Sequence, residues 1–199
     1  MDKKHYLITL IAPITCIISC PQDPSVIAGE SFFSHPSNKT MHVETTTEKT
    51  IISWSDFSID SHEKVYFTQP SENASVLNRV SSTKLSRING DLVSNGNIIL
   101  VNPNGIVIGK NGSIETNSLI ASTLDVLNDE YLHDGEMNFY GGLAKKIINL
   151  GTIYSKSDIF LISSSIENEG NISAPSGSIH FAAGHEILLS KKGGKSLFI

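Results

Sequence analysis

The chain has 199 residues, a formal net charge of −5 and 39% apolar residues, which fits about one globular domain and argues against intrinsic disorder and a membrane-embedded protein. Its two arginines and acidic excess cannot form the basic stripe that phosphate neutralisation requires, so nucleic-acid binding is not expected. Its 26 Ile and 12 Thr suit strands because they are β-branched, whereas its 28 Ser and 15 Asn suit turns. We therefore predict an all-β protein.

The N-terminus has the features of a secretory signal peptide. Lys3 and Lys4 precede an uncharged run over residues 7–19, and Pro21 follows. A transmembrane helix needs about 20 apolar residues, so this run is too short to span a bilayer. We predict a signal peptide over residues 1–20 and an exported domain over residues 21–199, with a buried first strand as the alternative.

Both cysteines fall in or beside this segment. Removing it leaves the mature chain with one cysteine at most, which rules out an internal disulfide and a cysteine-based zinc site there. The order Ile17-Ile18-Ser19-Cys20 also fits a lipoprotein signal. Cys20 is therefore a candidate for lipidation, with an ordinary signal peptide as the alternative.

A repeated glycine pattern organises the rest of the chain. Gly90, Gly112, Gly151 and Gly170 are each followed two residues later by Leu or Ile, and a second alternating apolar segment follows in each repeat. A turn glycine and an inward-pointing apolar residue are what a tightly coiled chain requires. We predict stacked coils of about 20 residues with two short strands each, which form a right-handed parallel β-helix. An antiparallel sandwich is the alternative.

Residues 125–136 interrupt this pattern with five carboxylates. Their spacing does not match a calcium-binding loop. We expect a solvated insertion outside the helical stack, with a short helical turn capped by Asn128.

Several ordered blocks of sequence resemble one family. They include Phe67-Thr68-Gln69-Pro70 and Leu77-Asn78-Arg79-Val80, and the others span residues 25–29, 51–59, 88–109, 119–125 and 177–184. With these blocks, the chain resembles the N-terminal secretion domain, also called the haemagglutination activity domain, of two-partner secretion exoproteins of the filamentous-haemagglutinin type.

This resemblance implies an exported domain that a cognate outer-membrane transporter recognises through its periplasmic region. It implies a secreted or cell-surface exoprotein of the adhesin or haemagglutinin kind, with a host-cell surface ligand as a further candidate partner and no cofactor. Members of the family continue into a long repetitive passenger. We therefore expect a truncated exoprotein, or a tail in which residues 197–199 fold back over the last coil.

An aromatic segment near the start is suited to capping the coil. Trp54, Phe57 and Ile59 would cover the apolar side chains and strand edges of the first coil.

Two further motifs carry the candidate recognition residues. In Asn102-Pro103-Asn104-Gly105, Pro favours the first corner of a turn and Asn-Gly tolerates a left-handed second corner. Asn78 and Arg79 are expected near a second corner. For both motifs, a structural corner and recognition by the transporter remain open.

The sequence contains no catalytic motif. His-Glu-x-x-His, Gly-x-Ser-x-Gly and the phosphate-binding glycine patterns are absent. Asp56 and Asp60 would share one face of a strand, which is also expected of a solvent face. We therefore predict a non-enzymatic protein without catalytic, cofactor or metal residues; a β-helical carbohydrate-active enzyme and a lipid-anchored adhesin are the alternatives.

Overall fold

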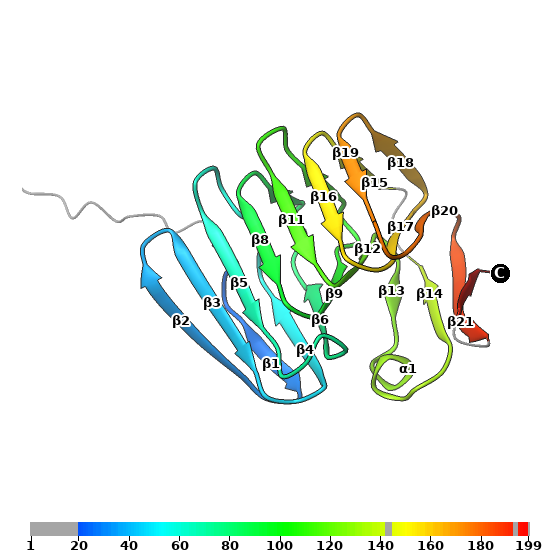
Figure 1. Cartoon of the computed structure of the whole chain (residues 1–199), viewed down its shortest axis with the longest axis horizontal. Coiled ribbons are helices and arrows are strands. Elements are labelled where there is room, and N and C mark those ends of the chain that lie inside the picture. The colour runs from blue at the N-terminus through cyan, green and yellow to red at the C-terminus, as the bar shows by residue number, and fades with distance from the viewer. Residues whose placement is uncertain (1–19, 142–144, 193–194, 199) are drawn as a thin grey trace, which may run out of the picture.

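The computed structural model describes residues 20–141, 145–192 and 195–198, and it is a parallel β-helix, which confirms the predicted fold. The coils follow one another from the blue N-terminal end to the orange C-terminal end in Figure 1. Residues 1–19, most of the predicted signal peptide, lie outside the described residues. The helix of the described residues is one short turn, and it is not long and apolar enough to cross a membrane.

Three sheets form the sides of the coil. The first sheet contains β1 (Ser25–Ala28), β4 (Lys49–Trp54), β6 (Ser75–Val80), β9 (Asn97–Val101), β12 (Ser118–Ser122), β17 (Ile159–Ser163) and β20 (Ile179–Ala183). The second contains β2 (Ser31–Ser37), β3 (Thr40–Thr45), β5 (Lys64–Thr68), β8 (Asp91–Ser94), β11 (Ser113–Thr116), β16 (Thr152–Ser155) and β19 (Asn171–Ser173). The third contains β7 (Ser86–Ile88), β10 (Ile106–Ile108), β15 (Lys146–Asn149) and β18 (Ser165–Asn168).

The full coils therefore have three strands, and the expectation of two per repeat was wrong. The strands of the third sheet have only three or four residues, and no glycine precedes them at a fixed spacing, so they do not stand out in the sequence. The glycine step from Gly112 to Gly151 is long because residues 125–140 leave the coil before β15 completes it.

The core lies inside the coil, in columns of side chains that point inward from successive strands. Val76, Ile98, Leu119 and Ile159 stand in register on neighbouring strands of the first sheet and are at most 1% exposed. Every second side chain of a strand points inward, and the parallel register places each apolar side chain directly over an apolar side chain of the next coil. The interior is thus one continuous apolar column.

The repeating glycines mark a corner where backbones pass very close together. A Cβ at Gly112 would overlap the carbonyl oxygen of Ile88, and one at Gly151 would overlap the carbonyl oxygens of Gly109 and Gly112. Gly170 stands in the same relation to Gly151. The spacing seen in the sequence is therefore a steric requirement of the corner.

The N-terminal end departs from the parallel pattern. β1 pairs antiparallel with β4, and β2 pairs antiparallel with β3, so that two strands close the start of the stack. Trp54, Phe57 and Ile59 are all 0% exposed and lie in the interior core at this end.

A fourth sheet lies against the outside of the first sheet. It consists of β13 (Asp125–Val126), β14 (Met137–Tyr140), β21 (Glu186–Lys192) and β22 (Lys195–Phe198), and α1 (Asn128–Leu132) lies between β13 and β14. We call residues 125–140 together with β21 and β22 the outer lobe. It is visible at the lower right of Figure 1.

The outer lobe packs an apolar core against the outer face of the first sheet, so the expectation of a merely solvated insertion was wrong. Val126, Tyr131 and Phe139 are at most 3% exposed and cluster with Ile51 and Leu77 from the outer face of the first sheet.

Two further expectations about this region change. α1 begins after Leu127 without a side-chain cap, and Asn128 instead binds Arg79. The tail over Lys195–Phe198 pairs with β21 in the outer lobe, while Ile199 lies outside the described residues.

The glycine corner gives the first testable prediction. We expect Gly151→Ala to destabilise the protein by about 2 to 3 kcal/mol, because the neighbouring carbonyls are backbone atoms that cannot move aside. The melting temperature should fall by roughly 4 to 12 °C. Gly184→Ala is the control, because the nearest atom to its Cβ would be the flexible end of Ile187 at 3.1 Å, and the nearest backbone atom would lie at an ordinary contact distance of 3.7 Å. Equal melting temperatures for the two variants would contradict the steric role of the corner.

Candidate functional site

Asn78 lies inside the coil beside Trp54. The Trp54 Nε1–H donates a hydrogen bond of 3.0 Å to Asn78 Oδ1, and Asn78 Nδ2 donates to the Val76 carbonyl at 3.3 Å. The Trp54 ring makes edge contacts with Phe33 and Phe57 at centroid distances of 5.8 and 5.5 Å. Since Asn78 is 0% exposed, its amide pairs with the one indole N–H of the chain and does not reach solvent.

Arg79 points to the opposite side of the same strand, toward the outer lobe. Its Nε, Nη1 and Nη2 donate to Asp125 Oδ1 at 2.8 Å, Asn128 Oδ1 at 2.7 Å and the Val126 carbonyl at 2.6 Å. The guanidinium presents its donors in a rigid planar fork, which suits it to holding three acceptors at once. Arg79 therefore fastens the outer lobe to β6.

Asn102 begins the tight turn that joins the first sheet to the third. Its Nδ2 donates to the Lys84 carbonyl and to Ser86 Oγ, both at 2.9 Å, and its Oδ1 accepts from Asn104 N at 2.9 Å. The Gly105 N–H closes the turn by donating to the Asn102 carbonyl at 3.0 Å. Asn102 is 0% exposed, so its side chain ties together two successive coils from within.

The other residues of this turn reach the surface in part. Pro103 and Asn104 are half-buried, and Asn104 Nδ2 donates to the Ser82 carbonyl at 2.8 Å. Gly105 has a φ of +110°, and a Cβ there would lie 3.0 Å from Leu85 Cδ1 and 3.2 Å from the Lys146 carbonyl oxygen. The left-handed corner that the sequence indicated is present.

The candidate recognition residues therefore do not form one surface in the folded protein. Asn78 and Asn102 are inside the coil, whereas Arg79, Pro103 and Asn104 are partly accessible, and Arg79 is engaged by the outer lobe. Their polar atoms are used in structural hydrogen bonds.

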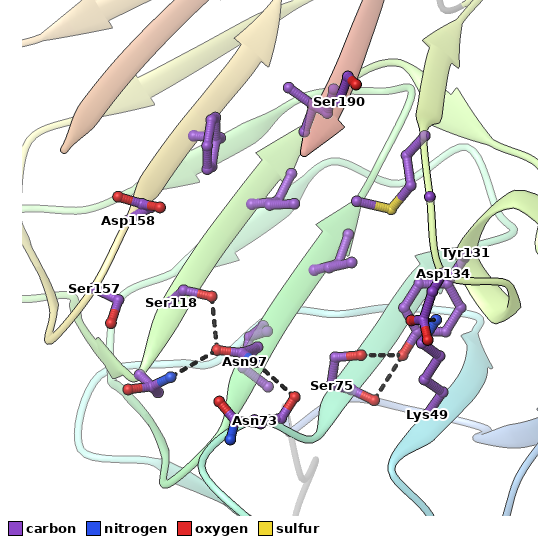
Figure 2. A pocket seen from close by; sticks show the side chains of 18 of the residues that line it. Lys49, Asn73, Ser75, Asn97, Ser118, Tyr131, Asp134, Ser157, Asp158 and Ser190 are labelled. Atoms are coloured by element: carbon purple, nitrogen blue, oxygen red, sulfur yellow. Dashed lines mark hydrogen bonds and ion pairs between the residues drawn. The ribbon is translucent and has the colours of Figure 1, made fainter. Parts of the chain in front are cut away.

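A groove that the sequence did not indicate runs between the first sheet and the outer lobe (Figure 2). It has a volume of about 410 Å³, with an apolar floor that includes Ile99, Ile120 and Phe160. Asn97 lies on its polar side, where its Oδ1 accepts from Asn117 Nδ2 at 3.0 Å and from Ser118 Oγ at 2.7 Å. The groove could not be found from sequence, because it depends on how residues distant in the chain pack.

One end of the groove is closed by Tyr131 of α1. Its hydroxyl donates to the carbonyls of Ser75 at 2.6 Å and Thr50 at 3.2 Å. Burial raises the pKa of Tyr131 to about 12, and a hydrogen bond with the Ser75 side chain lowers it in part. The neutral phenol thus holds the outer lobe to two strands of the first sheet.

The residues considered for catalysis and metal binding do not converge. β4 ends at Trp54, so Asp56 and Asp60 lie in the following turn region and not on one strand face. Asp56 pairs with Lys84 at 3.1 Å. No group of three His, Cys, Asp or Glu side chains suited to a metal ion occurs among the described residues.

Comparison with known proteins identifies the architecture. The profile of the TPS (two-partner secretion) secretion domain matches residues 22–196, which is nearly all of the coil and outer lobe. The chain belongs to the TPS secretion domain family. This family consists of secretion domains of exoproteins exported through the two-partner pathway, and it is not an enzyme family.

Individual relatives of this secretion domain come from Haemophilus influenzae. A heme/hemopexin-binding protein of strain Rd is 33% identical over 174 residues, covering 83% of this chain and 19% of the relative. A second heme/hemopexin-binding protein of the species is 32% identical over 130 residues, covering 62% of this chain and 14% of the relative. The secretion domain thus spans less than a fifth of the length of these relatives.

A solved structure agrees with the sequence comparison. The crystal structure of the HMW1 secretion domain from Haemophilus influenzae superposes with a TM-score of 0.80 at 35% identity, covering 86% of this chain and 46% of that one. The overall fold is therefore shared with a solved secretion domain.

Cys20 lies in the interior core of the secretion domain, at its N-terminal end. It is 1% exposed and free, and its pKa is raised to about 11 by burial and then by the nearby charges of Glu63 and Asp60. A lipid on this sulfur would have to draw it out of the core, which argues against the lipid anchor.

The buried thiol gives a second prediction. We expect iodoacetamide at about pH 8 to leave Cys20 of the folded full chain unmodified, because only the thiolate reacts and the sulfur is inaccessible. In urea the same thiol should react fully. Labelling of the folded protein at the unfolded rate would contradict the burial of Cys20.

The same shift makes stability depend on pH. Since the folded pKa lies above the ordinary value of 9.0, the neutral thiol favours the folded state below pH 9, and this contribution is lost as pH rises through about 11.

Proposed function

We propose that this domain directs an exoprotein through the outer membrane by binding the periplasmic region of a cognate transporter while still unfolded, and that it forms its coil outside the cell. The observation that carries the proposal is the match of residues 22–196 to the secretion domain family. The 35% identity to a secretion domain of the same fold supports it.

The positions of the motif residues support recognition before folding. Asn78 and Asn102 are 0% exposed, and their amide groups bond only to atoms of the coil. A transporter that reads these side chains must therefore meet them in an extended chain. After export, the same amides would enter the core and help hold successive coils together, which opposes return to the periplasm.

The remaining parts of the proposal concern processing and destination. We propose that residues 1–20 are removed as a signal peptide and that the protein is secreted or held at the cell surface without enzymatic activity. Adhesion to a host-cell ligand is proposed for the whole exoprotein and not for this domain.

Release of the full chain from cells tests the function. We expect release only when the cognate outer-membrane transporter is present, and equal release without it would contradict the proposal.

Two variants then separate recognition from stability. Asn102→Ala should lower the free energy of unfolding by about 2 to 4 kcal/mol, because it leaves several buried partners unpaired. Ser86→Ala is the control, because it removes one acceptor of Asn102 and keeps Asn102 itself. If the transporter recognises the Asn102 side chain, cells that make Asn102→Ala should release several-fold less protein than cells that make Ser86→Ala. The comparison is made at a temperature where both variants are folded. Equal release would assign Asn102 a purely structural role.

A further inference from the structure

The interior of the coil and the interface between coil and outer lobe have separate apolar clusters. The interior cluster contains no residue of the outer lobe, so the coil buries its inward side chains without it. The second cluster joins Val126, Phe139 and Leu189 of the outer lobe to Ile51 and Leu77 on the outer face of the first sheet. Packing of the coil therefore does not depend on the outer lobe, whereas the outer lobe has a core only where it meets the coil.

The two sets of contacts also differ in sequence separation. Neighbouring coils are joined by contacts such as Trp54 to Asn78, which are 24 residues apart. The outer lobe is joined to the coil by Tyr131 to Thr50 and by Lys49 to Asp134, which are 81 and 85 residues apart. Its sheet is completed by β21, which pairs with β14 over a still later part of the chain. Contacts of high sequence separation cost more loop-closure entropy, so we expect them to form after the shorter-range ones.

The interface between outer lobe and coil is incompletely packed. The groove of about 410 Å³ opens along it, between the floor at Ile99 and Phe160 and the wall at Met137 and Leu189. At its rim, Lys49 Nζ bonds to Asp134 Oδ1 at 3.0 Å, but the Asp134 side chain is 99% exposed. An exposed pair of this kind contributes little to stability. The outer lobe is thus fastened at few points, chiefly Arg79, Tyr131 and the second core.

From these observations we propose that the outer lobe is a latch that closes over preformed coils as a separate, late step. When the outer lobe closes, it shields Ile51 and Leu77 from water. Both residues are 0% exposed in the closed state. Arg79 then secures the latch through its three acceptors.

The latch has a consequence for export that rests on the proposed function. In a chain that emerges N-terminus first, Tyr131 cannot reach Thr50 until 81 further residues have passed. The first coils would stack first with an uncovered apolar outer face, and the latch would cover it only after most of the domain is outside.

Native-state hydrogen exchange on the purified full chain tests the latch without any transporter. We expect amides of β13, β14 and β21 to open together and to be less protected than those of β6, β9 and β12. Arg79→Leu should speed exchange in the outer lobe at least tenfold and change the coil amides less than twofold. Arg87→Leu, which replaces the other arginine of the chain on the third sheet, should change neither group.

Two results would overturn the proposal. One is equal acceleration of coil and outer-lobe amides in Arg79→Leu, which would mean that they unfold as one unit. The other is simultaneous protection of both groups in pulse labelling during refolding, where we expect the coil amides to become protected first. If Arg79→Leu does not fold, Leu189→Ala probes the same interface, because Leu189 is 6% exposed in the second core. Failure of the latch would leave transporter-dependent release unaffected, so the two proposals fail separately.

Discussion

The hydrogen-bond ladder between successive coils sets most of what is seen in this protein. Parallel strands about 4.8 Å apart place each residue directly over its counterpart in the next coil. A position that is apolar in one coil must then be compatible with the same position above and below it, as in the column of Val76, Ile98, Leu119 and Ile159. Where the chain turns most sharply, the same stacking leaves no room for a side chain. Glycine therefore occupies these positions, which are Gly112, Gly151 and Gly170.

This constraint explains which parts of the fold could be read from the sequence. Because stacking repeats residue types at a regular interval, the glycine corner and the strands that follow it appear in the sequence as a periodic pattern. The turn at Asn102-Pro103-Asn104-Gly105 was predictable because each residue suits its backbone position, and Gly105 does adopt φ +110°. The prediction of a β-helix rested on the glycine period, whereas the family resemblance rested on ordered blocks of sequence along the chain.

The remaining features depend on contacts that leave no period. The strands of the third sheet are too short to show alternation, and the outer lobe combines residues near position 130 with a strand near position 190. The carboxylates of residues 125–136 suggested a solvated insertion, yet one of them, Asp125, binds Arg79, and the apolar residues between them form a second core. Asn78 and Asn102 were open to either role in the sequence, because only their burial in the structure shows that a partner cannot reach them in the folded coil.

We propose that the domain passes its transporter before the coils form. Glu115 and Tyr154 face each other on the solvent side of neighbouring coils, in register between β11 and β16, and both are exposed. Adjacent strands bring Cα atoms within the range that a disulfide spans. Replacing both with cysteine would let the oxidising periplasm lock two coils together if they form there. Since the account has the coils forming outside, release of this variant should match that of the unmodified chain, and cross-linked protein should be found only outside the cell. Release of a chain already cross-linked in the periplasm would contradict the account, because a locked coil cannot pass as an extended chain.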